Sequence, residues 1–223
     1  MNVSGFTFVR NGVLYDYPFF ESISSTLPLC QEFIVVVGHS TDGTLERLQQ
    51  LERRKVRIVE TDWDENLRTG GAILAQQTNI ALDHVRGDWA LYLQADEVLH
   101  EEDYPVIHAA MERYLHDPEV EGLLFSYLHF FGDYRHIGHS RRWYRREIRI
   151  VRTGIGVRSW RDAQGFRVNS RKLRVREIPA RIFHYGWVRP PRLQQEKQRS
   201  FNRLWHSDEW VQRNLPSLPE YDY

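Results

Sequence analysis

The stretch WALYLQADEVL, residues 89–99, determines how the chain is interpreted, because an apolar strand runs directly into polar residues there. Residues 89–93 form a short continuous apolar run, which is typical of a buried strand. Gln94, Asp96 and Glu97 follow at once. Because ligands bind at the carboxyl ends of the strands in open parallel sheets, we expect a cleft here, with Asp96 and Glu97 as candidates to line it.

Strands and helices alternate on the N-terminal side of this stretch. Apolar or β-branched runs predict strands at 3–9, 32–38, 56–61 and 89–94. Helical patterns lie between them, around 17–27, after Asp42 or Thr44, and from Gly71 to Gly87. This order predicts an α/β protein with a mostly parallel sheet and helices on both faces.

The C-terminal side has a different pattern. A helix is predicted near 101–117 and a strand at 121–132, followed from Tyr134 by Arg-rich strands and turns and by a helix from Pro190 to about Trp210. We find no repeat and no flexible linker, and therefore predict one domain over residues 1–223.

The formal net charge of zero conceals an uneven distribution. Residues 135–203 contain 20 Lys and Arg against 4 Asp and Glu. Such a segment attracts phosphates, nucleic acid or anionic lipid headgroups. The alternative is that these arginines pair with the acidic N-terminal part or lie on solvated strand faces.

Several classes of protein are disfavoured. The single cysteine, Cys30, excludes an internal disulfide framework, and we expect it to be a half-buried thiol in a loop. The longest apolar run, FIVVVG at 33–38, is far shorter than the about 20 residues of a membrane-spanning helix. With no signal peptide, we expect a cytoplasmic protein, and contact with the inner face of a membrane remains open. The absence of GxxxxGK[ST] and GxGxxG motifs argues against an ATPase or a dehydrogenase.

Asp96 by itself has two interpretations. A hard divalent cation that is also bound by diphosphate oxygens needs only one or two carboxylate ligands from the protein. Asp96 therefore suits Mg²⁺ or Mn²⁺. Alternatively, the acidic residues from 96 to 102 only complement the dipole of the helix that follows.

Several motifs together carry a family resemblance. They are VVVGHSTDGT (35–44), SGFTFVRNG (4–12), TGGAILAQQTNIALDHVRGDWALYLQADE (69–97) and HYGW (184–187). In this combination the chain resembles the family-2 glycosyltransferases of the GT-A fold over most of residues 3–190. The resemblance implies a nucleotide-sugar-binding half at 1–133 and an Arg-rich acceptor half at 134–223.

The resemblance also implies roles for residues near the donor. Asp42 of STDGT corresponds to the turn aspartate near the nucleotide, and Arg10 and Asn11 border the base. Asp96 matches the last aspartate of the Asp-x-Asp motif, which holds the metal, Mn²⁺ or Mg²⁺. Gln94 occupies the position of the first aspartate, where a neutral amide can still bond a ribose hydroxyl but supplies no negative charge.

Two further residues come from the C-terminal half. His184 in RIFHYGW matches a histidine that contacts the metal or the diphosphate, although a packed core histidine is the alternative. Asp162 in SWRDAQGF lies where the family's catalytic acid residue follows an Arg-rich strand, and a turn residue or a partner of Arg161 is the alternative.

The implied reaction is inverting transfer of a sugar from a UDP- or GDP-sugar to a carbohydrate or lipid-linked acceptor hydroxyl, with Asp162 as the base. Two alternatives remain. Gln94 is consistent with a nucleotide-sugar-binding pseudoenzyme. The cluster 135–149, in which arginines are interleaved with Trp143 and Tyr144, also resembles a single-stranded nucleic-acid groove, although we favour a solvated strand or the rim of an acceptor cleft.

Overall fold

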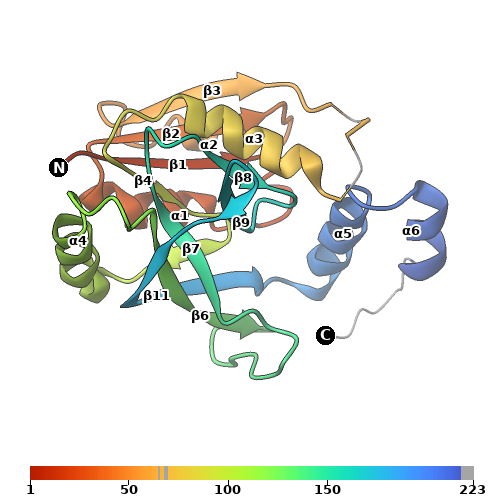
Figure 1. The fold of residues 1–223 in the computed structure, drawn as a ribbon. Coiled ribbons are helices and arrows are strands. Elements are labelled where there is room, and N and C mark those ends of the chain that lie inside the picture. Colours follow the sequence, from red (N-terminus) through yellow and green to blue (C-terminus); the bar gives the residue numbers. More distant parts are fainter. Residues whose placement is uncertain (65, 68–69, 217–223) are drawn as a thin grey trace.

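The computed structural model describes residues 1–64, 66–67 and 70–216. An eight-stranded sheet has the order β3-β2-β1-β4-β7-β6-β11-β5, and a three-stranded sheet has the order β10-β9-β8 (Figure 1). The strands of the large sheet are β1 (Val3–Val9), β2 (Glu32–Gly38), β3 (Val56–Thr61), β4 (Trp89–Tyr92), β5 (Glu97–Leu99), β6 (Gly122–Phe131), β7 (Arg146–Arg152) and β11 (Val175–Trp187). Those of the small sheet are β8 (Val157–Trp160), β9 (Gly165–Val168) and β10 (Arg171–Lys172).

The helices occupy the connections and the C-terminal segment. They are α1 (Phe19–Thr26), α2 (Thr44–Leu48), α3 (Ala72–Asp83), α4 (Tyr104–Arg113), α5 (Pro191–Asn202) and α6 (Asp208–Asn214), with short 3-10 turns η1 (Leu27–Leu29) and η2 (Glu101–Asp103). The predicted α/β class with a mostly parallel sheet of the GT-A type is confirmed. Strands from both sides of residue 134 pair in one sheet, and the single domain over 1–223 stays a prediction.

The two faces of the large sheet are both buried. In β2, Phe33 and Val35 join a core that includes Ile23 of α1 and Ile107 of α4. Ile34 and Val36 point the other way, into a core with Leu82 of α3 and Phe166 of β9. The continuous apolar sequence of β2 follows from this burial on both sides, and α3 lies along β1 and β2 in Figure 1.

Strand direction determines where a ligand can bind. β1, β2, β3 and β4 run parallel, while β7 is antiparallel to β4 and β6, and β11 is parallel to β6. The carboxyl ends of β1, β4, β6 and β11 therefore lie at one edge of the sheet, which is the edge where open α/β sheets bind ligands.

Two local predictions were wrong, and one strand was missed. The helix expected from Pro190 to Trp210 is two helices, because the chain turns after Asn202 and Ser207 caps α6 by accepting a hydrogen bond from the amide of Trp210 at 3.3 Å. Residues 97–99 form an unpredicted strand, β5, on the edge of the sheet beside β11. Cys30 is fully buried rather than half-buried, at 2% exposure, with its Sγ close to Gly5 and its side chain in the same core as Phe33.

Candidate functional site

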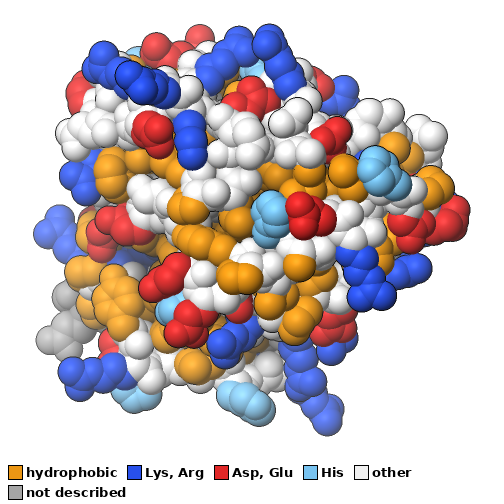
Figure 2. Space-filling view, turned by 90° about the vertical axis from the view of Figure 1, so that its left-hand side faces the viewer, with side chains coloured by type: hydrophobic (Ala, Val, Ile, Leu, Met, Phe, Trp, Pro, Cys, Tyr) orange, Lys and Arg blue, Asp and Glu red, His pale blue; other side chains and the backbone are white. Residues whose placement is uncertain are grey.

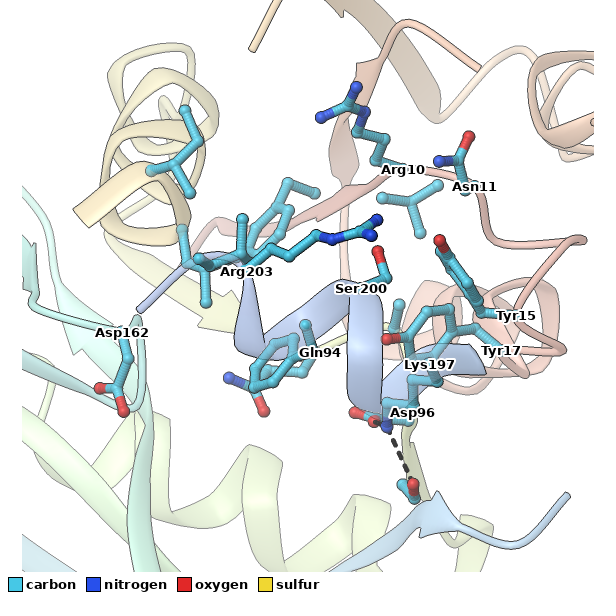
Figure 3. Close-up of a pocket in the computed structure, with 18 of the residues that line it drawn as sticks. Arg10, Asn11, Tyr15, Tyr17, Gln94, Asp96, Asp162, Lys197, Ser200 and Arg203 are labelled. Carbon is cyan, nitrogen blue, oxygen red and sulfur yellow. Dashed lines mark hydrogen bonds and ion pairs between the residues drawn. The ribbon is translucent and has the colours of Figure 1, made fainter. Parts of the chain in front are cut away.

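A pocket of about 660 Å³ opens at the carboxyl edge of the large sheet. The ends of β1, β4 and β11 form it together with the turn between β8 and β9 and one side of α5 (Figure 3). It brings together site residues that the sequence predicted from distant segments: Arg10, Asn11, Gln94, Asp96, Asp162 and His184. Asp42 is not among the lining residues.

Asp96 lies in the wall of the pocket beside a lysine from α5. Its Oδ2 is 3.3 Å from Nζ of Lys197, which also donates to the carbonyl of Gly186 at 2.8 Å. Burial has the largest single effect and would raise the pKa of Asp96, but Lys197, His184 and Arg189 together outweigh it and lower this pKa to about 2. Burial lowers the pKa of Lys197 to about 8, although Asp96 opposes the shift. The pair is therefore ionised at neutral pH.

His184 faces the other oxygen of Asp96, with Nε2 at 3.8 Å from Oδ1. Its Nδ1 is 2.9 Å from Nδ1 of His129, whose Nε2 is 2.6 Å from the carbonyl of Tyr144. A carbonyl only accepts, so Nε2 of His129 donates and its Nδ1 accepts from His184. Burial lowers the pKa of both histidines, that of His129 to about 4. Nε2 of neutral His184 therefore presents a lone pair toward Asp96.

Gly186 makes this close arrangement possible. A Cβ atom at position 186 would lie 2.6 Å from Nε2 of His184 and 2.9 Å from Oδ2 of Asp96. At these distances a Cβ atom fits only if the side chains of His184 and Asp96 move apart. The glycine of HYGW is thus required by the approach of Asp96 to His184.

Glu97 has no place in the pocket lining, although the sequence made it a candidate beside Asp96. It is fully buried and accepts two bonds from Arg149, at 2.8 and 2.7 Å, and one from the hydroxyl of Tyr127 at 2.8 Å. The carboxylate of Glu97 also accepts a hydrogen bond from the backbone N–H of Gln94 at 3.0 Å. Glu97 therefore fixes the turn that presents Gln94 and Asp96, and the expectation that it lines the cleft is wrong.

Asp162 occupies an unusual turn between β8 and β9. Its neighbours Arg161 and Ala163 both have positive φ, at 56° and 63°. Left-handed backbone is costly for residues other than glycine, and such turns concentrate at functional sites. The carboxylate of Asp162 has no hydrogen bond or ion pair with another residue of the described chain. Figure 3 shows it across the pocket from Asp96.

Arg10 and Asn11 follow β1 at the opening of the pocket. The guanidinium of Arg10 lies over the ring of Trp63, 4.9 Å from its centroid. Asn11 has a positive φ of 51°, and its backbone N–H donates to Oγ of Ser40 at 3.0 Å. The STDGT turn thus holds the end of β1, which the family resemblance places beside the nucleotide base.

Asp42 stabilises the loop that follows β1 through hydrogen bonds outside the pocket lining. Its Oδ2 accepts from the amide of Leu14 at 2.7 Å, and its Oδ1 accepts from the hydroxyl of Thr44 at 2.6 Å. Thr44 in turn accepts from the amide of Gly12 at 2.8 Å. The contacts of Asp42 are therefore structural, and its predicted contact with a nucleotide stays a prediction.

Lys197, Tyr17 and His129 are site residues that the sequence reasoning missed. The ammonium of Lys197 and the guanidinium of Arg189 lie 4.9 and 5.1 Å from the centroid of the Tyr17 ring. One signal was available for Lys197. It lies four residues before Phe201 at helical spacing, but Phe201 is itself 39% exposed, so the signal was weak.

Acids from the N-terminal half neutralise part of the Arg-rich segment. Arg149 pairs with Glu97, Arg158 with Asp83, and Arg171 with Glu121. On the face shown in Figure 2, acidic and basic side chains are interspersed. These pairs support the alternative that many of the arginines serve the fold.

The donor set does not fit a divalent cation. Asp96 supplies the one negative charge at the predicted position, Gln94 is neutral, and Lys197 already neutralises Asp96. Within the ranges 1–64, 66–67 and 70–216, no group of three His, Cys, Asp or Glu side chains is arranged to hold a metal ion. An ammonium 3.3 Å from the carboxylate would also repel an incoming dication.

Comparisons with known proteins agree with this architecture. A family model described as Glycosyl transferase family 2 matches residues 18–182. The structure is similar to S. aureus TarS 1–349 in complex with UDP-GlcNAc, with a TM-score of 0.54 and 15% identity over 96% of this chain and 70% of that one. The UDP complex gives a TM-score of 0.53, with 15% identity over the same 96% and 70%.

The crystal structure of S. aureus TarS has a TM-score of 0.52 and 15% identity over 90% of this chain, but the match spans only 39% of the TarS chain. No curated protein sequence matches. In the part of the chain that the structure describes, no helix is both long and apolar enough to cross a membrane.

Proposed function

The chain belongs to glycosyl transferase family 2, and from this premise we propose that it transfers a sugar from a nucleotide-diphosphate donor to an acceptor hydroxyl, with inversion at the anomeric carbon. One observation carries the proposal. Six predicted site residues, separated by up to 174 positions from Arg10 to His184, line a single pocket of about 660 Å³. That volume is within the range of small-molecule sites, which is about 300–1,000 Å³.

Asp162 is the proposed catalytic base. The acceptor oxygen attacks the anomeric carbon and forms the new C–O bond, while the bond from that carbon to the diphosphate oxygen breaks. The carboxylate of Asp162 takes the hydroxyl proton, and nucleoside diphosphate leaves with the bonding electrons. The support for this role is a carboxylate in the pocket lining, held in a turn with two left-handed neighbours.

Donor and acceptor are assigned to opposite sides of the pocket. We assign Arg10, Asn11 and Gln94, which line the pocket, to the donor, a UDP- or GDP-sugar by the family resemblance. Tyr144 and Trp187 also line the pocket, and their rings suit a carbohydrate or lipid-linked acceptor. The cytoplasmic location and contact with the inner face of a membrane stay predictions.

The metal prediction rests on family membership. Mn²⁺ or Mg²⁺ would be held by Asp96 and His184 and would supply positive charge to the leaving diphosphate. The residues present do not fit it, because Lys197 already pairs with Asp96. The proposed transfer therefore has no step at a metal ion.

A nucleotide-sugar-binding pseudoenzyme is the second candidate, and the neutral Gln94 at the first acidic position favours it. A DNA- or RNA-binding role for the Arg-rich half would instead predict binding to oligonucleotides that weakens steeply with salt.

Calorimetric titration and a hydrolysis assay test the proposal. UDP, GDP and their sugar conjugates are titrated separately, each in EDTA and in Mn²⁺. Binding of one nucleotide, together with slow release of nucleoside diphosphate from its sugar conjugate, supports a glycosyltransferase. Binding without release supports the pseudoenzyme, and no binding under any condition contradicts both.

A further inference from the structure

Resting on the proposed function, we propose that Lys197 takes the place of the divalent cation in this chain, so that its ammonium binds the leaving diphosphate and donor binding needs no metal. The side chains at the site do not fit the metal that the family resemblance implies, because Lys197 already pairs with Asp96.

The position of Lys197 is determined by three contacts. Its Nζ is 3.3 Å from Oδ2 of Asp96 and 2.8 Å from the carbonyl oxygen of Gly186, and it lies 4.9 Å from the centroid of the Tyr17 ring. The side chain is only 10% exposed, yet it is part of the pocket lining. The ammonium is therefore held in one place at the site rather than extended into solvent.

The ammonium retains capacity for a ligand. It has three N–H donors, and Asp96 and Gly186 accept two of them. A diphosphate oxygen in the pocket can accept the third. In this arrangement Asp96 does not bind a cation that comes with the substrate; it holds a cation that belongs to the protein.

The surrounding charges agree with this assignment. Asp96 and Lys197 cancel each other, and the neutral Gln94 adds no negative charge beside them. Arg189 does not line the pocket, but it is buried against the ring of Tyr17 and its positive charge also acts on Asp96. The wall can therefore accept a diphosphate without an added dication.

His184 completes the wall without adding charge. Because Nδ1 of His184 donates to His129, its Nε2 carries no proton, and the lone pair of Nε2 faces Asp96. Nε2 of His184 can accept a hydrogen bond from Lys197, or from a hydroxyl of the nucleotide-sugar donor, if either group moves within reach. The histidine therefore has a use in a site that contains no metal.

The first test measures the affinity of the unmodified protein for UDP and GDP by calorimetry, in EDTA and in Mn²⁺. The proposal expects dissociation constants that agree within about twofold between the two conditions. Binding that appears only with Mn²⁺ would overturn the role of Lys197 and leave the proposed function intact. Absence of nucleotide binding in both conditions would overturn the proposed function, and the present inference with it.

The second test uses Lys197→Met, which keeps the length of the side chain and removes its charge. We expect at least about tenfold weaker binding in EDTA, equivalent to about 1.4 kcal/mol. The double variant Asp96→Asn with Lys197→Met removes both charges, so no unpaired charge is left buried, and it should bind as weakly. The matched control is Lys172→Met, at an exposed position on β10. Unchanged binding in a folded double variant would contradict the proposal.

Discussion

Asp96 and Glu97 are adjacent in the chain and face different environments. Asp96 lines the pocket and pairs with Lys197. Glu97 is completely buried and pairs with Arg149 on β7. One carboxylate is thus available to the site, and the other fixes the turn that presents it, since Glu97 also accepts from the amide of Gln94.

Glu97→Gln tests this structural role. The substitution leaves Arg149 buried without its counter-charge, so we expect the free energy of unfolding to fall by about 3–5 kcal/mol, measured by urea denaturation. The matched control is Glu119→Gln, which removes an exposed ion pair with Arg174 and should cost no more than about 1 kcal/mol. Equal losses in the two variants would contradict a special role for Glu97.

Asp162→Asn tests the proposed base. The variant keeps the size of the side chain and cannot take the acceptor proton, so sugar transfer should slow by about 10²–10⁴-fold while nucleotide affinity is unchanged. Glu112→Gln, on the exposed face of α4, provides the control. A variant with normal turnover would eliminate Asp162 as the base.

Gly186→Ala tests the close approach of Asp96 and His184. The added methyl would lie 2.6 Å from Nε2 of His184, so both side chains must move. We expect a loss of stability of about 1–3 kcal/mol, seen in denaturation, together with weaker nucleotide binding. Gly165→Ala is a good control, because a Cβ there meets nothing within 4 Å. If the two variants behave alike, packing at position 186 is not limiting.

The buried His129 predicts a pH dependence of stability. Burial lowers the pKa of its imidazole from the usual value of 6.5 to about 4 in the folded protein. Between these values the unfolded chain binds a proton that the folded chain does not, so stability falls as the pH falls through this window and is unaffected above it. Denaturation at about pH 5 and about pH 7.5 measures the difference.

The variant His129→Phe should reduce this difference between the two pH values, whereas the exposed His139→Phe should leave it unchanged. A wild-type protein whose stability is the same at both values would show that His129 is not held neutral by the fold.

The sequence by itself determined the fold and much of the pocket. β2 is apolar on both faces, so it had to be covered on both, and the alternation of strands with helices required a mostly parallel sheet. Parallel strands share one carboxyl edge, so residues after β1 and after β4 were expected at the same place, and Arg10, Asn11, Gln94 and Asp96 line one pocket there.

Only the tertiary structure decided which charges meet. Sequence periodicity assigns a residue to one face of its own helix or strand. It does not tell which residue of a neighbouring element that face will contact. Lys197 is 101 residues from Asp96, and Glu97 is 52 residues from Arg149. Among so many basic residues, only chain packing selects the one that reaches each carboxylate. That selection made Asp96 the partner of a lysine rather than a free ligand, because the interaction of charges depends on distance and burial, and neither is written in local sequence.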